Sequence, residues 1–402
     1  AWEQRKLSEI ADKVTEKNSG LQYVETFTNS AEFGIISQRD FFDHDIAKLS
    51  SLDGYYIVKN EDFVYNPRIS TSAPVGPINR NKLGRTGVMS PLYTVFRPHD
   101  VDTTYLEHFF KCAYWHSFMN FNGDSGARSD RFSIKNDVFF QMPIPLPHID
   151  EQRKIGELLT CLDHLITLHQ RKFEKLTNVK KSMLEKMFPQ NGSSYPEIRF
   201  KGFTDPWEQR KLGELVDRVV RKNTNNESTL PLTISAQYGL VDQITYFNNR
   251  VASRDVSNYY LVLNGEFAYN KSTSDGYPFG AVKRLDLYEK GVLSTLYIVF
   301  APKKEQQIDS DYLTVFFDTD RWHKGVAERA AEGARNHGLL NISAEDFFDI
   351  DLSVPKDIVE QKQIGAFIRQ LDNLITLHQR KPFLMKWRTS DANRNKTNRL
   401  VL

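Results

Sequence analysis

The stretch EQRKIGELLTCLDHLITLHQRK (Glu151–Lys172) decides the fold, because it carries two signals at once. Its apolar residues recur at intervals of three and four, which is the spacing of one face of an α-helix. Its last eight letters, LITLHQRK, return unchanged at Leu374–Lys381. Such a match within one chain is hard to obtain by chance, so the stretch predicts both a helix and an internal repeat.

The repeat extends outward from this stretch over almost the whole chain. The offset between matching segments stays between 204 and 209 residues. So small a drift indicates two copies of one domain with small loop insertions, a tandem duplication rather than a solenoid. The other matching pairs are WEQRKL (Trp2–Leu7 and Trp207–Leu212), YYIVKNEDFVYN (Tyr55–Asn66) with YYLVLNGEFAYN (Tyr259–Asn270), and GVMSPLYTVFRP (Gly87–Pro98) with GVLSTLYIVFAP (Gly291–Pro302).

The helical spacing of the opening stretch continues to Phe188. It predicts a helix over 151–188, which at 1.5 Å per residue is about 57 Å long. No single globular core needs such a helix, so we expect a spacer whose apolar seam packs against its own second copy. The seam residues are Ile155, Leu158, Leu162, Leu165 and His169 in the first copy, and Ile364, Phe367, Leu371, Leu374 and His378 in the second.

Both copies place a histidine at the same seam position, His169 and His378. A polar group inside such a seam usually fixes its register at some cost in stability. The alternative is that both rings lie at the edge of the seam and reach water. The sequence leaves both interpretations open.

The rest of each copy contains short β-rich runs broken by Gly, Pro and Asn. We expect strands at Tyr55–Val58, Phe63–Tyr65 and Leu92–Phe96, and an amphipathic helix around Leu106–Phe118. The predicted fold class is α+β: two tandem α/β domains separated by two long antiparallel helices, a coiled-coil-like spacer with an internal pseudo-twofold repeat. The expected boundaries are 1–150 for the first domain, 151–188 for the first helix, 189–206 for a connector, 207–359 for the second domain, 360–388 for the second helix and 389–402 for an atypical tail.

The composition of the 402 residues is that of a globular chain, with 40% apolar and 26% charged residues. No apolar run approaches the length of a membrane helix, and the N-terminus lacks a signal-peptide pattern. The two cysteines, Cys112 and Cys161, provide neither a disulfide framework nor a metal cluster, so we expect a reducing, cytoplasmic setting.

Motifs for catalysis are missing from the sequence. It contains no phosphate-binding GxxxxGK[ST] loop, no Gly-rich dinucleotide loop, no HExxH, no zinc spacing and no GxSxG elbow. Asn66-Pro67-Arg68 is a partial match to the Asn-Pro-Pro-Tyr signature of DNA amino-methyltransferases, and its counterpart Asn270-Lys271 has no proline. We therefore expect no catalytic residues and no metal. An enzyme with an unrecognised active site stays as an alternative.

The segments that follow each Tyr-Asn pair are the strongest binding candidates. Asn66–Arg85 contains four cations and no acidic residue, and Asn270–Arg284 contains three cations and one Asp. Lys and Arg bind phosphate, while Ser, Thr, Asn and Arg can read base edges. The alternative of a plain solvated loop is weakened because both copies keep these residue types at matched places. The GAR segments, which begin at Gly126 and Gly333, are a second candidate.

The candidate nucleic-acid-binding residues are Asn66, Arg68, Ser70, Thr71, Arg80, Lys82, Arg85, Arg128 and Arg131 in the first copy, and Asn270, Lys271, Ser272, Thr273, Lys283, Arg284, Arg335, Asn336 and His337 in the second. Four of these cations, Arg80, Arg85, Lys283 and Arg284, are expected to neutralise phosphate. Each change to alanine should then lower the salt dependence of binding by about one counterion.

The sequence resembles the specificity subunits of Type I restriction-modification enzymes over nearly its whole length. The motifs that carry the resemblance are Glu151–Lys172, PEIRFKGFTDPWEQRKLGEL (Pro196–Leu215), GEFAYNKSTSDGYPFGAV (Gly265–Val282) and GARNHGLLNISAEDFF (Gly333–Phe348). The resemblance implies two target-recognition domains, held apart by the two helices, that each read half of a bipartite, asymmetric site in double-stranded DNA.

The resemblance also implies partners. Two methyltransferase subunits would methylate adenine with S-adenosylmethionine, and two motor subunits would translocate and cut DNA with ATP and Mg²⁺. This chain would need no cofactor and would catalyse nothing. A scaffold that binds only proteins is the remaining alternative, since the basic loops could be incidental.

The sequence departs from the family pattern in two places. It has no counterpart of Pro196–Asp205 before Trp2, and the second helix loses its apolar pattern after Lys381. Pro382 removes a helical hydrogen bond and clashes with the preceding turn. We therefore expect the second helix to kink or stop near Pro382, and deletion of the residues after Arg388 to cost little stability.

Overall fold

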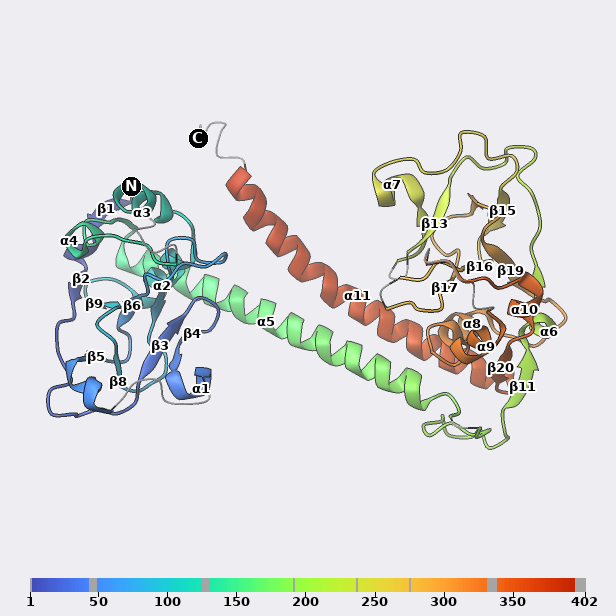
Figure 1. The fold of residues 1–402 in the computed structure, drawn as a ribbon, viewed down its shortest axis with the longest axis horizontal. Coiled ribbons are helices and arrows are strands. Elements are labelled where there is room, and N and C mark those ends of the chain that lie inside the picture. The colour runs from blue at the N-terminus through green and yellow to red at the C-terminus, as the bar shows by residue number, and fades with distance from the viewer. Residues whose placement is uncertain are drawn as a thin grey trace. The chain divides into compact units, whose positions relative to one another are not determined.

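The computed structural model describes residues 2–42, 49–124, 130–190, 192–235, 238–274, 276–330 and 338–394, with the side chains of 380–394 excepted (Figure 1). The chain divides into two compact units, unit 1 (Ala1–Thr167) and unit 2 (Leu168–Leu402). The boundary falls inside a single long helix, α5 (Ile149–Lys186). The first half of α5 therefore belongs to unit 1 and its second half to unit 2.

Unit 1 is built around a four-stranded sheet of order β2-β9-β6-β7, with three strand pairs, β1-β10, β3-β4 and β5-β8, beside it. All these pairings are antiparallel. Its strands are β1 (Glu3–Lys6), β2 (Ala11–Lys13), β3 (Phe27–Ser30), β4 (Gly34–Ser37), β5 (Tyr56–Val58), β6 (Phe63–Tyr65), β7 (Ile78–Arg80), β8 (Gly87–Met89), β9 (Thr94–Pro98) and β10 (Pro143–Leu146). Its shorter helices are η1 (Leu7–Glu9), α1 (Gln38–Phe42), η2 (Leu49–Gly54), α2 (Thr103–Lys111), α3 (His116–Asn122) and α4 (Asn136–Phe139).

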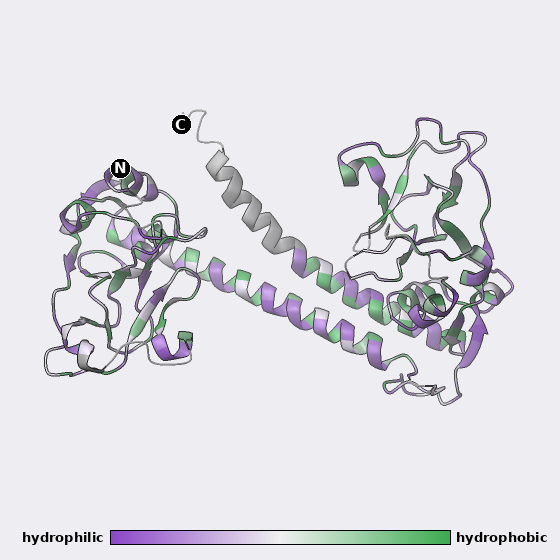
Figure 2. Ribbon diagram, in the orientation of Figure 1, coloured by the Kyte–Doolittle hydropathy of each residue, from purple (hydrophilic) through white to green (hydrophobic). Residues whose placement is uncertain are grey.

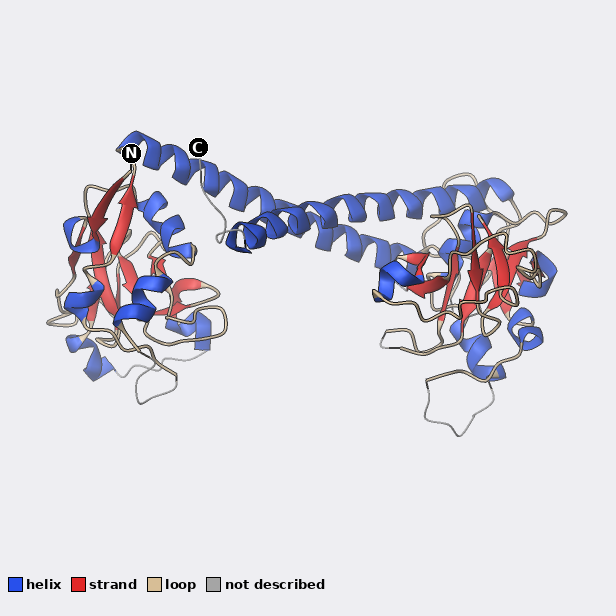
Figure 3. Ribbon diagram, turned by 90° about the horizontal axis from the view of Figure 1, so that it is seen from above, coloured by secondary structure: helices blue, strands red, loops and turns tan. Residues whose placement is uncertain are grey.

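Unit 2 repeats this topology, with a four-stranded sheet of order β12-β19-β16-β17 and the pairs β11-β20, β13-β14 and β15-β18. In each unit the strands lie among short helices and loops (Figure 3). Its strands are β11 (Glu208–Lys211), β12 (Val216–Arg218), β13 (Leu232–Ser235), β14 (Gly239–Asp242), β15 (Tyr260–Leu263), β16 (Phe267–Asn270), β17 (Ala281–Arg284), β18 (Lys290–Leu293), β19 (Ile298–Pro302) and β20 (Asp351–Val354). Its helices are α6 (Leu212–Leu215), α7 (Gln243–Phe247), α8 (Ser310–Phe317), α9 (His323–Arg329), α10 (Ala344–Phe348) and α11 (Ile358–Arg394).

The matched sequence segments form matched elements. The segment Tyr55–Asn66 becomes β5 and β6, and Tyr259–Asn270 becomes β15 and β16. In each sheet a central pair of phenylalanines stacks, Phe63 on Phe96 with ring centroids 5.6 Å apart and Phe267 on Phe300 at 5.3 Å. All four of these side chains are fully buried. Burying such large apolar surfaces is the main term that stabilises each sheet.

In unit 2 the second half of α5 runs antiparallel to α11. Leu176, Val179 and Met183 pack against the cluster that contains Ile364 and Ile368. Alternating apolar and polar residues on both helices are visible in Figure 2. These three residues of α5 are therefore covered by the core of unit 2.

The two seam histidines contact each other. Nδ1 of His169 lies 2.8 Å from Nδ1 of His378, and His378 is only 7% exposed. A hydrogen bond between two Nδ1 atoms requires one ring to donate and the other to accept. This geometry favours the interpretation that the pair fixes the register over the interpretation that both rings reach water.

Two expectations about helices were wrong. Helix α11 does not stop near Pro382 but continues to Arg394. A proline removes one backbone hydrogen bond, which the remaining bonds of a long helix can tolerate. The single helix expected around Leu106–Phe118 is instead α2 and α3. The chain turns between them so that the indole of Trp115 can donate to the carbonyl of Phe110 inside the core.

The connector 189–206 contains no helix or strand among its described residues. It is nevertheless packed against unit 2. Phe200 lies on Phe367, with ring centroids 5.9 Å apart, and Arg199 forms an ion pair with Glu360. The connector thus contributes to the packing of unit 2 as well as joining two elements.

Candidate nucleic-acid interface

In unit 1 the backbone joins the two candidate segments that the sequence presented separately. The amide of Ile69 donates to the carbonyl of Asp130 at 3.0 Å, and the amide of Phe132 donates to the carbonyl of Pro67 at 2.7 Å. Arg68 and Arg131 are paired across this short antiparallel bridge. We call residues 66–72 and 130–134 the unit 1 strip.

Unit 2 contains the same arrangement. The amide of Leu340 donates to the carbonyl of Lys271 at 3.0 Å, and the amide of Thr273 donates to the carbonyl of Gly338 at 2.6 Å. Ser272 and Leu339 are paired across an antiparallel bridge. We call residues 270–274 and 338–342 the unit 2 strip.

A shared set of contacts fixes the backbone of both strips. The amide oxygens of Asn66 and Asn270 each accept a hydrogen bond from the backbone two residues later, at 3.0 Å. Such side-chain turns hold the start of a loop in one shape. Opposite them, Gly76 and Gly280 have φ of +82° and +75°, and a Cβ at either glycine would lie 2.1 Å from the carbonyl oxygen of that asparagine. Only glycine fits such a close approach.

Two buried tyrosines form hydrogen bonds to the same loops. The hydroxyl of Tyr65 donates to the carbonyl of Val75, and that of Tyr269 donates to the carbonyl of Phe279, both at 2.9 Å. Burial raises the pKa of both phenols. The Tyr-Asn pair that marked these segments in the sequence therefore holds the two loops in shape.

The exposed candidates lie on the strips or near them. Arg68 is 70% exposed at its side chain, with Asp130 at 3.8 Å, and Ser70 and Thr71 are exposed beside it. Arg131 is half-buried, as are Asn66, Asn270, Lys271 and Thr273, whereas Ser272 is exposed. Arg128, Arg335, Asn336 and His337 lie outside the described residues.

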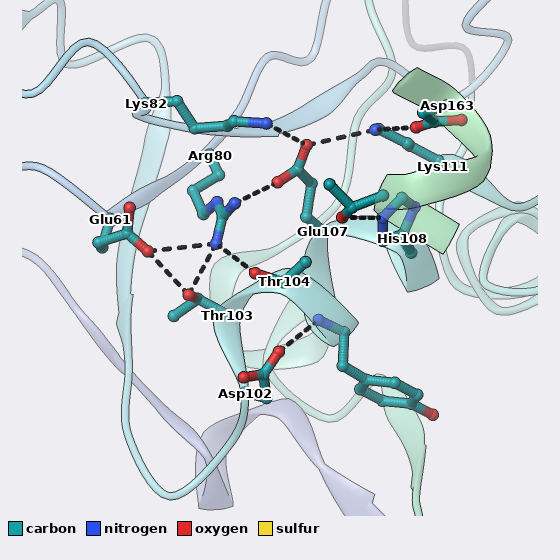
Figure 4. Close-up of polar contacts among 12 residues, drawn as sticks. Glu61, Arg80, Lys82, Asp102, Thr103, Thr104, Glu107, His108, Lys111 and Asp163 are labelled. Atoms are coloured by element: carbon teal, nitrogen blue, oxygen red, sulfur yellow. Dashed lines mark hydrogen bonds and ion pairs between the residues drawn. The ribbon is translucent and has the colours of Figure 1, made fainter. Parts of the chain in front are cut away.

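Arg80 has a different environment. Its guanidinium contacts Glu107 at 2.6 Å and Glu61 at 3.2 Å, and it donates to the hydroxyls of Thr103 and Thr104 at the start of α2 (Figure 4). The side chain is only 9% exposed. Arg80 therefore ties the end of β7 to α2, and its charge is already balanced by carboxylates.

Glu107 is the centre of this network. Its side chain is 12% exposed and also contacts Lys82 at 3.1 Å and Lys111 at 3.3 Å. Burial raises the pKa of Glu107, but Arg80, Lys111 and Lys82 lower it by more, so the pKa lies below its ordinary value. Lys82 keeps 57% of its side chain exposed and can still face an anion.

The remaining cations expected to bind phosphate are also paired. Arg85 contacts Glu25 at 2.7 Å. Arg284 contacts Asp286 and Asp311, each at 2.7 Å, and its side chain is 7% exposed. Lys283 contacts Asp318 at 2.8 Å. The structure does not bring these cations together with Arg68 or Lys271 in one cluster. Each of them forms an ion pair with a carboxylate of the same unit.

The seam residues fall into two groups. Ile364, Leu371 and His378 are buried, and Phe367 is packed against the unit 2 core. Ile155 packs against the unit 1 core, and Leu162 and His169 are half-buried. By contrast Leu158, Leu165 and Leu374 are 61%, 41% and 42% exposed.

Sequence reasoning missed a group of exposed aromatic side chains. Phe33 and Tyr238, each 60% exposed, occupy matched positions at the tips of the β3-β4 and β13-β14 turns. Strand β3, which leads into the unit 1 turn, is bound to the strip, since the side-chain amide of Asn66 donates to the carbonyl of Asn29 at 2.8 Å. The signal that could have found them is the offset of 205, which aligns Phe33 with Tyr238.

Nowhere in the described part of the chain do three His, Cys, Asp or Glu side chains gather as a metal site would require. Of the helices that the structure describes, none is long and apolar enough to cross a membrane. A hollow of about 420 Å³ lies beside the unit 1 strip and is lined by Tyr93, Arg131 and Asn136 among others.

The family model described as "Type I restriction modification DNA specificity domain" matches residues 1–178 and again 204–383. The chain belongs to this family. The two matches correspond to the two copies of the repeat, so the chain contains two specificity domains in a mixed helix and sheet fold. The strips therefore belong to two specificity domains of one chain.

Among curated relatives, the Type I restriction enzyme MjaVIII specificity subunit of Methanocaldococcus jannaschii is 31% identical to this specificity chain over 87 residues, 21% of this chain and 20% of the relative. The putative type I restriction enzyme MjaX specificity subunit of the same organism is 30% identical over 84 residues, 20% of each chain. The matched stretches thus span about a fifth of these relatives.

Among solved structures, the S subunit of a Type-I restriction-modification system from M. genitalium aligns with 96% of this chain and 93% of its own. The TM-score is 0.55 at 11% sequence identity. At this identity the likeness concerns the fold alone. It agrees with the family match in placing this specificity chain among proteins of the same architecture.

Proposed function

We propose that this chain is the DNA-recognition subunit of a Type I restriction-modification complex. Each unit is a target-recognition domain that reads one half of a bipartite site in double-stranded DNA. The observation that supports this most directly is the repeated strip, which has one backbone frame in both units but different side chains. Because Arg68 and Arg131 stand where unit 2 has Ser272 and Leu339, the two half-sites should differ in sequence.

The residues of the strips divide into two roles. Arg68, Arg131 and Lys271 carry positive charge at or near the surface and are suited to phosphate. Ser70, Thr71, Ser272 and Thr273 are short donors and acceptors suited to base edges. Arg128, Arg335, Asn336 and His337 adjoin the strips in sequence and complete the proposed set. The internal ion pairs of Arg80, Arg284 and Lys283 support a positioning role for them.

The two long helices are proposed to act as the spacer between the half-sites. The expected division is domains at 1–150 and 207–359, helices at 151–188 and from 360, and the connector at 189–206. The antiparallel contact of α5 with α11 in unit 2 and the paired histidines support a coiled-coil-like seam with a fixed register. The pseudo-twofold relation follows from the repeat.

The helices also offer surfaces for partner subunits. Leu158, Leu165, Leu168, Leu374 and Leu377 are between 41% and 61% exposed, which is unusual for so many leucines on two helices. We propose that two methyltransferase subunits dock there and that two motor subunits complete the assembly in the cytoplasm. S-adenosylmethionine, ATP and Mg²⁺ would be used by those partners, and this chain would need no cofactor.

A domain exchange tests the modular part of the proposal. Residues 1–150 are replaced by the corresponding domain of another family member, and methylated sites are mapped in cells that contain the methyltransferase subunit. One half-site should change while the other stays the same, because each domain carries its own strip. The reciprocal exchange of 207–359 is the matched control. A chimera in which both half-sites change would contradict independent reading.

An insertion tests the spacer. Four residues, which add about one helical turn or 6 Å, are inserted after Thr167, where α5 passes from one unit to the other. The preferred gap between half-sites should grow by one or two base pairs, given a rise of about 3.4 Å per base pair. The control is four residues inserted in the connector after Gly192. An unchanged gap with the helix insertion would exclude the spacer role.

A further inference from the structure

Unit 1 has a hollow of about 420 Å³ beside its strip, which we call the unit 1 hollow. Its walls come from β2, β5, the start of β9, α4 and the strip residues 131–134. The lining side chains that matter here are Lys13, Tyr56, Tyr93, Thr94, Arg131 and Asn136. A pocket of this volume is large enough to hold a small organic ligand.

The unit 1 hollow carries two cations that are available to a ligand. Lys13 is exposed and Arg131 is half-buried. Within the part of the chain that the structure describes, neither forms an ion pair with a carboxylate. Arg80 and Arg85, by contrast, are already balanced by glutamates. Lys13 and Arg131 can therefore bind an anion without giving up an internal partner.

Aromatic rings and an amide complete the lining. Tyr56 and Tyr93 are half-buried, and both line the hollow. Oδ1 of Asn136 accepts from the hydroxyl of Thr94 at 3.0 Å, which leaves the amide nitrogen of Asn136 able to donate to a ligand. Bases stack on aromatic side chains, and an asparagine amide can read a base edge. Together with the cations, these groups match a nucleotide, which presents a phosphate, a planar base and a polar base edge.

Unit 2 has an ion pair at the matched place. Lys13 corresponds to Arg218 at the offset of 205. Asp137, on α4, corresponds to Glu345 at the offset of 208. Arg218 contacts Glu345 at 3.2 Å and so links β12 to α10, the counterparts of two walls of the hollow. The cation at this position is therefore already paired in unit 2.

Unit 2 also lacks two of the groups that line the hollow. Leu339 stands where unit 1 has Arg131, and Ala344 stands where unit 1 has Asn136. Every position involved lies inside both copies of the repeat, so the contrast comes from substitutions at matched places. It predicts that a ligand of the hollow is bound by unit 1 and not by unit 2.

We propose that the unit 1 hollow binds one nucleotide. Lys13 and Arg131 bind its phosphate, its base lies against Tyr56 or Tyr93, and the amide of Asn136 donates to the base edge. In target DNA the source is a nucleotide that leaves the base stack beside the strip, and this part rests on the proposed DNA-recognition function. A free mononucleotide presents the same groups, and the experiment separates the two sources.

Mismatched DNA tests the first source. The isolated full chain is titrated with duplexes of the site mapped from methylation in cells, each with one mismatched base pair at a different position in or beside the unit 1 half-site. We expect a mismatch at one position to tighten binding about tenfold relative to the paired duplex, because extruding a base costs least where its pair is already broken. Mismatches at positions that are read directly should weaken binding instead.

A double variant closes the hollow without changing its charge. Lys13→Arg with Asp137→Glu places the two residues of the unit 2 ion pair at the matched positions of unit 1, so the gain from the mismatch should disappear. Lys13→Ala and Asn136→Ala should each lower the gain several-fold, since each removes a contact. The control, Arg218→Ala in unit 2, should leave the gain unchanged. The readout is the ratio of two dissociation constants for the same variant, so a general loss of DNA affinity does not imitate it.

Deoxynucleoside monophosphates test the second source. Each of the four is added to the full chain without DNA, and binding is measured by equilibrium dialysis. Saturable binding that the double variant lowers at least fivefold, without any gain from a mismatch in DNA, would identify a free nucleotide as the occupant.

The proposal is overturned if neither the mismatch nor the mononucleotides give a signal, or if the signal persists in the double variant. Unchanged binding of paired DNA together with that result would leave the DNA-recognition function intact and remove only the nucleotide site. Mononucleotide binding that the double variant abolishes, in a chain that does not bind DNA, would instead support the nucleotide site and contradict the DNA-recognition function.

Discussion

The two units share one frame and differ in how that frame is completed. In unit 2, the second half of α5 and the connector supply Lys180, Phe188 and Arg199, which fill an apolar site and neutralise buried carboxylates. Unit 1 completes the matched polar site with its own residues, since Lys111 contacts Asp163 directly at 3.1 Å. The comparison shows that a duplicated domain can keep its sheet and strip while different side chains form the ion pairs at matched positions.

The largest expected effect concerns the apolar site. Phe188→Ala should destabilise unit 2 by about 3–5 kcal/mol, since it leaves a cavity among Trp207, Tyr312 and Phe316. Trp2→Ala in unit 1 is the matched change and should cost less than about 1 kcal/mol, because Trp2 is 51% exposed. Hydrogen exchange, followed separately in each unit at increasing urea concentration, measures the loss of unfolding free energy for both variants. Equal losses would mean that the two sites are equally covered.

The second prediction separates Arg80 from Arg68. Arg80→Ala should lower the free energy of unfolding by about 2–3 kcal/mol, because it leaves Glu107 short of a partner in a site that is 12% exposed. It should change the salt dependence of DNA binding little. Arg68→Ala should do the opposite, lowering the slope of log K against log salt by about 0.9 with stability within about 0.5 kcal/mol. If Arg80→Ala lowered the salt slope and Arg68→Ala lowered the stability, Arg80 rather than Arg68 would contact DNA.

The third prediction concerns the ion pairs that join α5 to the domain of unit 2. Asp318 lies 2.8 Å from Lys283 and 3.2 Å from Lys180, with 20% of its side chain exposed. Asp318→Asn should cost about 2 kcal/mol at neutral pH, at the low end for breaking a buried pair because the site is partly exposed. In unit 1 the position of Asp318 is taken by Lys111, whose partner is Asp163; Asp163→Asn should cost less than about 1 kcal/mol, since Asp163 is 55% exposed.

The effect of Asp318 should depend on pH. Burial raises its pKa, but Lys283 and Lys180 lower it by more, so in the folded chain the pKa lies below the ordinary 3.8. The pair therefore stabilises the fold above about pH 3.8 and loses this contribution as the pH falls through the lower, folded value. The stability of the Asp318→Asn chain should change less over that acid range than that of the original chain. If the stability of the two chains changed equally with pH over that range, the ion pairs of Asp318 would not contribute as proposed.

The smallest effect is expected at the C-terminal end. Deletion of the residues after Arg388 should change stability by no more than about 0.5 kcal/mol, because Thr389–Arg394 carry no apolar seam. DNA reading should persist. Thermal denaturation of the shortened chain decides the matter, and a midpoint lowered by many degrees would show that the end of α11 is packed.

Local patterns in the sequence were enough to predict the long helix, the duplication and three of the strands of unit 1. Helical spacing from Ile155 onward and the exact repeats depend on neighbouring letters, and they led directly to α5, the beginning of α11 and two equivalent domains. The marker pair Tyr-Asn was also visible, since Asn turns and the matched glycines act over a few residues. The resemblance to the specificity subunits rested on the same letters.

Only the tertiary structure decided which cations are paired with carboxylates and which apolar side chains are buried. Arg68 and Arg80 look equivalent in the sequence, yet one faces solvent and the other contacts Glu107, because the start of α2 packs against β7. Similarly, Trp2 and Trp207 begin the same six-letter motif, but only Trp207 is covered by Phe188. Such contacts join residues far apart in the chain, so their presence depends on how the chain folds back on itself, which no local pattern records.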